Sequence, residues 1–85
     1  MKAYEFIIKS EEGLHARPAA NFVNKSRSYK SEITVEKGGE IFNAKSITSV
    51  LSMGACKNDK IIIKAEGDDE SHAIEELALF FYSIP

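Results

Sequence analysis

Apolar and polar side chains alternate near the start of the chain, and this period of two is typical of a β-strand with one buried face. Over residues 4–8 the alternating apolar positions are Tyr4, Phe6 and Ile8. Residues 60–65 instead contain a run of β-branched side chains. Such a run predicts a central strand of the sheet.

Two more strands are predicted in the middle of the chain. Residues 33–36 and 40–43 are rich in side chains that favour strands, and they flank Gly38 and Gly39. A glycine pair supplies the positive φ angles of a tight turn between antiparallel strands. The sequence therefore predicts a β-hairpin here.

A helical period appears between the first two predicted strands. Apolar side chains recur there at positions i, i+3, i+4 and i+7, namely Ala16, Ala19, Ala20 and Val23. This spacing predicts an amphipathic helix that begins near His15 and ends at Arg27 or Ser28. Pro18 fits that start, because proline is tolerated in the first turn, where an N–H has no partner within the helix.

Two further helices follow. A short one is predicted from the N-cap Ser46 to Gly54 as C-cap, with helical spacing at Ile47, Val50 and Leu51. Residues 67–70 supply a turn, an N-cap and acidic side chains suited to the positive end of a helix dipole. The last helix is predicted over residues 70–82, with inward positions at Ile74, Leu77, Ala78 and Phe81.

The predicted order of elements is β-α-β-β-α-β-α. Three helices and one sheet indicate an α+β fold of two layers. The hairpin makes one antiparallel pair of strands secure, whereas the sequence leaves the order of the strands in the sheet open. With 85 residues and no linker or repeat, we expect one domain over residues 1–85.

Composition excludes several classes of function. Eleven basic and thirteen acidic side chains give a net charge of −2, which does not favour nucleic-acid binding. The single cysteine, Cys56, cannot form an internal disulfide, and no Cys/His cluster suggests a metal. Since no segment looks like a signal peptide or a membrane span, we expect a cytoplasmic protein, mature as written, without membrane insertion.

The candidate chemistry lies in residues 13–19, where His15 stands at the point at which a loop becomes a helix. The first N–H groups of a helix lack internal acceptors and favour an anion. Arg17 adds a guanidinium that can bind phosphate through two hydrogen bonds. A neutral imidazole is a nucleophile near pH 7, so this combination suits a transient phosphohistidine.

Each of these residues also has a plainer interpretation. His15 could serve as a polar cap and Arg17 as a solvated side chain, and chemistry alone leaves both alternatives open. His72 is expected to be a surface residue, and Cys56 lacks a neighbouring histidine that would favour catalysis. Residues 68–70 fit capping and dipole roles rather than a calcium loop.

Two separated motifs resemble the histidine-containing phosphocarrier (HPr) family of the phosphoenolpyruvate-dependent sugar phosphotransferase system. Residues 13–19 resemble that family's active-site signature. Residues 43–47, followed by residues 51–54, resemble its regulatory-serine region. The similarity extends over essentially the whole chain. It implies an open-faced sandwich, in which a four-stranded antiparallel sheet is covered on one face by three helices.

The resemblance also implies roles for individual residues. His15 would accept a phosphoryl group from phosphorylated enzyme I and donate it to the IIA domains of sugar permeases, without a cofactor and without being a turnover enzyme. Arg17 would stabilise the phosphate. Ser46 would be the target of an HPr kinase/phosphorylase and could connect the protein to a catabolite-control transcription regulator.

A partner surface is expected around the first two helices of what we expect to be a monomer. We expect transient binding through a small apolar patch rimmed by basic side chains that face acidic partners. The expected patch residues are Ala16, Ala20, Ile47, Thr48 and Leu51. The expected rim residues are Lys25, Arg27 and Lys45.

Three features depart from the family pattern. Glu11 and Glu12 place two carboxylates before the active-site turn, where they are expected to repel an incoming phosphate. Thr48 stands where an apolar residue is usual. The apolar residues 79–82 exceed the needs of one buried helix face, and we expect Phe80 or Tyr82 to extend the core rather than to mediate self-association.

Two other functions are compatible with parts of the sequence. One is a regulatory protein of the same fold that acts mainly through phosphorylation of Ser46 and binding to a transcription regulator. The presence of His15 argues against that as its only role. The other is a small α+β binding module in which the motif arises by chance.

Overall fold

The computed structural model describes residues 1–11, 13–14 and 16–83. Its elements follow the predicted order β-α-β-β-α-β-α. The strands are β1 (Lys2–Ile7), β2 (Glu32–Lys37), β3 (Glu40–Asn43) and β4 (Lys60–Glu66). The helices are α1 (Ala16–Arg27), α2 (Ile47–Ser52) and α3 (Glu70–Ser83).

The four strands form one antiparallel sheet in the order β1-β4-β2-β3. The register places Tyr4, Ile63, Val35 and Phe42 opposite one another in a row across the sheet. The predicted hairpin is confirmed, with both glycines at positive φ between β2 and β3. β2 and β3, which are neighbours in the sequence, thus pair with each other. β1 and β4 also pair, although most of the chain lies between them.

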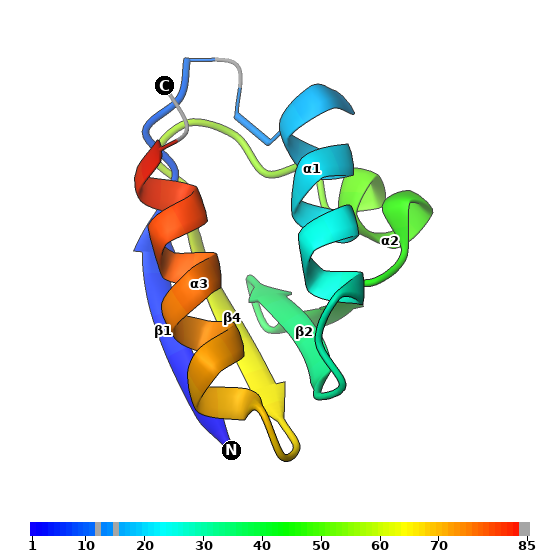
Figure 1. Ribbon diagram of the computed structural model, residues 1–85. Coiled ribbons are helices and arrows are strands. Elements are labelled where there is room, and N and C mark those ends of the chain that lie inside the picture. Colours follow the sequence, from blue (N-terminus) through cyan, green and yellow to red (C-terminus); the bar gives the residue numbers. More distant parts are fainter. Residues whose placement is uncertain (12, 15, 84–85) are drawn as a thin grey trace.

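All three helices cover one face of this sheet (Figure 1). α1 packs against both α2 and α3, and α3 lies over β1 and β4. Burying the apolar stripe of each helix against the sheet is the main source of stability in such a two-layer arrangement. The largest fully buried apolar side chains come from both layers: Phe22, Ile33, Val35, Val50, Ile61, Ile63 and Leu77.

The opposite face of the sheet has no helix over it in the described part of the chain. Register places Glu5, Ile62, Glu36 and Ile41 in a row on that face. Ile41 is 65% exposed, and an ion pair of 2.7 Å joins Glu36 to Lys64. The expected fold, a four-stranded antiparallel sheet covered on one face by three helices, is therefore confirmed.

The apolar end of α3 contributes to the core through some of its residues only. Leu77 and Phe81 are buried as predicted, whereas Ile74 and Ala78 are half-buried. Phe80 packs on the core, as expected for extra core. Tyr82 is 73% exposed, so the apolar excess is divided between interior and surface.

Asp69 has a role beyond the capping predicted for it. Its main-chain carbonyl accepts a hydrogen bond from the N–H of Ala73, as at a helix start. Its carboxylate, however, reaches across the fold and accepts the N–H groups of Lys30 and Ser31 at 2.9 Å each, together with the Ser31 hydroxyl. These hydrogen bonds, led by that from the Ser31 hydroxyl, lower the pKa of Asp69 to about 2.

We expect Asp69→Asn to lower the free energy of unfolding at pH 7 and to flatten its dependence on acid pH. The pKa in the folded state is about 2 and the usual value is 3.8, so the carboxylate's contribution is complete above about pH 4. It is then lost as the pH falls toward 2. Urea unfolding from pH 7 to pH 2 measures this, with the exposed neighbour in Asp68→Asn as control. Parallel pH profiles for Asp69→Asn and the unmodified protein would contradict it.

Candidate functional site

The start of α1 is the centre of the candidate site. The helix begins at Ala16, and Pro18 lies in its first turn, as predicted. Arg17 is exposed at the second helical position. His15 and Glu12 lie outside the described residues, so the site is described through their neighbours.

The two residues that precede His15 in the sequence are held against the loop before β4. The N–H of Leu14 donates to the carbonyl of Ala55 at 3.0 Å. Gly13 has φ of +67°, and a Cβ there would lie 2.4 Å from the Ala55 oxygen and 2.9 Å from the Cα of Cys56. Only glycine fits this approach, which explains the glycine at the start of the motif.

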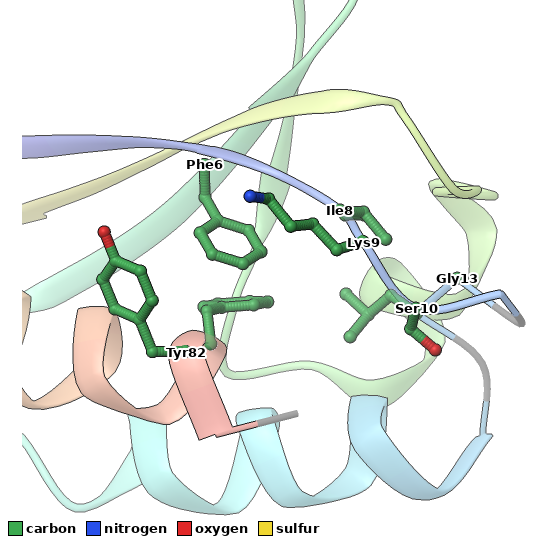
Figure 2. Close-up of a pocket in the computed structure, with 8 residues that line it drawn as sticks. Phe6, Ile8, Lys9, Ser10, Gly13 and Tyr82 are labelled. Carbon is green, nitrogen blue, oxygen red and sulfur yellow. The ribbon is translucent and has the colours of Figure 1, made fainter. Parts of the chain in front are cut away.

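A small pocket of about 90 Å³ lies on the other side of this segment (Figure 2). The Phe6 ring contacts those of Phe81 and Tyr82, with centroid distances of 5.0 and 6.1 Å. These ring contacts attach the end of β1 to the end of α3. The lining residues are Phe6, Ile8, Lys9, Ser10, Gly13, Leu14, Phe81 and Tyr82.

The second motif forms α2 and its cap. The Ser46 hydroxyl accepts the N–H of Ser49 at 3.3 Å, so the predicted N-cap is confirmed. At the other end Gly54, with φ of +62°, follows the C-cap residue Met53. Ser46 is half-buried, and Ile47 after it is exposed.

Several expected partner-binding residues meet where α1 and α2 pack together. A shallow hollow between the helices is lined by Ala20, Val23, Asn24, Arg27 and Ile47. The next turn of α2 adds the exposed Leu51, and Thr48 is exposed beside it. The side chain of Ala16 is outside the described part of the structure.

The three basic side chains of the expected rim all contact other residues of this chain. The Lys45 ammonium donates to the carbonyl of Tyr29 at 2.8 Å, and Arg27 Nε donates to the carbonyl of Lys45 at 3.0 Å. Lys25 forms an ion pair of 3.5 Å with Glu76. Two of the three cations thus connect the end of α1 to the segment that leads into α2.

Sequence reasoning missed the loop over residues 54–59, which contacts the segment before α1. Its turn is closed by Asp59, whose carboxylate accepts the N–H of Cys56 at 2.8 Å. Asp at the end of a short polar stretch is a turn signal, and this could have indicated an ordered loop. Nothing in the sequence indicates which part of the chain the loop touches.

No cluster of three or more His, Cys, Asp or Glu side chains suited to a metal ion occurs among residues 1–11, 13–14 and 16–83. In the same part of the chain, no helix has the length and apolar character needed to cross a membrane.

The sequence resembles known proteins along nearly the whole chain. A family model described as "PTS HPr component phosphorylation site" matches residues 3–83. The chain belongs to the HPr family. The phosphocarrier protein HPr of Borreliella burgdorferi is 45% identical over 74 residues, which cover 87% of this chain and 86% of that protein.

Solved structures of the HPr family have the same fold. HPr from Thermoanaerobacter tengcongensis superposes with a TM-score of 0.94 at 43% identity, covering 98% of this chain and 93% of that one. Crh, a catabolite-repression protein of Bacillus subtilis described as a domain-swapped dimer, gives a TM-score of 0.76 at 35% identity, covering 91% and 88%. The resemblance inferred from the two motifs is thus confirmed, and the chain is a phosphocarrier protein of the phosphotransferase system.

Proposed function

We propose that this HPr-family chain carries the phosphoryl group on His15, accepting it from phosphorylated enzyme I and donating it to the IIA domains of sugar permeases. The observation that supports this most directly is the glycine-containing segment directly before His15, which Gly13 and Leu14 hold against Ala55 at the entrance to α1. The chain acts as a carrier in the cytoplasm, not as a turnover enzyme, because the phosphoryl group leaves to a second protein.

The chemistry of acceptance follows from the residues around His15. A ring nitrogen attacks the phosphorus, a P–N bond forms, and the bond from phosphorus to the donor breaks with its electron pair remaining on the donor. The exposed Arg17 guanidinium and the N–H groups at the start of α1, which in a helix lack internal acceptors, stabilise the negative charge. Donation to the next protein reverses these steps.

Partners dock on the surface formed by α1 and α2. The hollow lined by Ala20 and Ile47, together with the exposed Leu51, supplies a small apolar contact. Transient complexes of this kind bury little area and rely on charge for orientation. Arg27, exposed at the edge of the hollow, supplies positive charge toward an acidic partner surface.

Ser46 is a second, regulatory position, modified by an HPr kinase/phosphorylase where the host possesses one. The similarity to Crh, a catabolite-repression protein, favours a role in binding a catabolite-control transcription regulator. The Ser46 side chain is half-buried at the start of α2 beside Ile47, so a phosphate there adds charge next to the proposed docking surface.

The proposed carrier function is tested by intact-mass measurement after incubation with enzyme I and phosphoenolpyruvate. The expected result is one added phosphoryl group that acid removes. An adduct that resists acid and forms only with ATP and kinase would instead identify a regulatory protein that acts through Ser46. A chain that gains no phosphate under either condition would contradict both proposals.

We expect Ser46→Asp to slow phosphorylation of His15 by enzyme I about three- to tenfold at low ionic strength, because it adds a negative charge beside the docking surface. The matched control is Ser46→Asn, which keeps an N-cap side chain without the charge. Labelling rates with radioactive phosphoenolpyruvate measure the effect. Equal rates for the two variants at low salt would remove the electrostatic explanation.

A further inference from the structure

The loop over residues 54–59 supports the segment that leads from β1 toward α1. The N–H of Asn58 donates to the carbonyl of Ile8 at 2.7 Å, and the N–H of Ile8 donates to the carbonyl of Asp59 at 2.9 Å. Near the other end of the segment, Leu14 donates to Ala55 at 3.0 Å. In Figure 1 this loop, in yellow-green, crosses near the segment at the end of the molecule where α1 begins.

The loop itself has a fixed turn. Asp59 bonds twice to Cys56, through its carboxylate to the Cys56 N–H at 2.8 Å and through its own N–H to the Cys56 carbonyl at 3.0 Å. The same carboxylate lies 3.7 Å from the ammonium of Lys37. Asn58 has φ of +76°, a conformation that asparagine tolerates better than most residues. The backbone of Lys57 is therefore held between fixed neighbours.

An ion pair joins described side chains of the two segments. The Lys57 ammonium binds the carboxylate of Glu11. The Glu11 side chain is 83% exposed and that of Lys57 is 42% exposed, so the pair is accessible to solvent and its strength depends on salt. Glu11 is one of the two carboxylates that the sequence places directly before the active-site turn.

We propose that Lys57 is a positioning residue for phosphoryl transfer: it binds Glu11 and keeps this carboxylate from approaching the phosphoryl group at His15. The inference rests on the proposed phosphorylation of His15. An unpaired carboxylate would repel the incoming anion and would favour the protonated, non-nucleophilic imidazole. Pairing with a cation anchored in the 54–59 loop reduces both effects.

The test compares the unmodified protein with Lys57→Gln, Glu11→Gln and the double variant. Two quantities are measured at low and at high ionic strength: the rate of His15 phosphorylation by phosphoramidate, a small donor that needs no docking surface, and the pKa of the His15 imidazole from an NMR titration. At low salt we expect Lys57→Gln to react about threefold more slowly and to have a raised imidazole pKa. Both differences should shrink at high salt.

If Glu11 and Lys57 act as a pair, the effects of substituting them are not additive, whereas two independent charges would give additive effects. Glu11→Gln should increase the rate more in the Lys57→Gln background than in the unmodified protein, because only there is Glu11 free to move. Lys57→Arg, which keeps the cation, should restore the normal rate. The matched control is Lys60→Gln, which removes the same charge from an exposed pair with Glu5, 3.6 Å apart on the open face of the sheet, and should change neither quantity.

The outcomes separate the two proposals. Independent, additive effects of the two substitutions, or an unchanged rate and imidazole pKa in Lys57→Gln at low salt, would overturn the role of Lys57. If the imidazole pKa responds as expected but enzyme I and phosphoenolpyruvate never phosphorylate the unmodified protein, the carrier function fails while the pairing of Glu11 with Lys57 stands.

Discussion

Replacing His15 by alanine is expected to abolish phosphoenolpyruvate-dependent labelling completely. If the imidazole forms the bond to phosphorus, Arg17 and the first N–H groups of α1 have nothing to stabilise once it is removed. The fold should remain, because the described core is built from the sheet and the three helices that cover it. Intact mass after incubation with enzyme I measures the loss, and circular dichroism confirms folding.

The chain offers a matched control for this variant. It contains only one other histidine, His72, which is exposed on α3 with its ring edge-on to that of Tyr29. His72→Ala removes the same kind of side chain at a position distant in sequence from the motif. Labelling of this variant should equal that of the unmodified protein. Labelling that persists in a folded His15→Ala protein, or that disappears in His72→Ala, would contradict the assignment.

Replacing Phe22 by alanine is expected to cause the largest loss of stability, about 3–5 kcal/mol. Phe22 lies on α1 with 0% of its surface exposed, and its ring contacts those of Phe81 at 5.1 Å and Phe80 at 6.3 Å. The substitution removes this packing and leaves a cavity between α1 and α3. Small domains are stable by about 5–15 kcal/mol, so much of the total is at risk.

Urea or thermal unfolding measures this loss, and each kcal/mol corresponds to a shift of roughly 4–8 °C in Tm for a domain of this size. Phe80→Ala is the matched control, because it removes the same atoms from a half-buried position in the same cluster. Its destabilisation should be clearly smaller. Equal losses for the two variants would mean that burial of Phe22 does not set the stability of the interface between α1 and α3.

The structure changes the interpretation of the acidic residues before the active-site turn. From the sequence, Glu11 and Glu12 are expected to repel phosphate alike. In the fold, Glu11 is paired with Lys57 from a loop more than forty positions away. Glu12 lies outside the described residues, and its repulsive effect stays a prediction.

Local chemistry allowed the sequence to predict the helices and strands, which the structure confirms. The hairpin followed from two adjacent glycines, and the start of α2 followed from the hydroxyl of Ser46, because both signals act over two to four residues. The family was predicted from the resemblance of the two motifs around His15 and Ser46 to known proteins, and the match to the family model confirms it. Each of these features can be recognised without knowing where the rest of the chain lies.

Only the tertiary structure decided the relations between distant parts of the chain. The order β1-β4-β2-β3, the binding of Asp69 to Ser31 and the engagement of Lys45 with Tyr29 each join residues that are far apart in sequence. An exposed or capping side chain has several polar groups within possible reach, and the sequence contains no signal that selects among them. The choice is made when the helices pack on the sheet, because that packing alone sets which donors and acceptors meet.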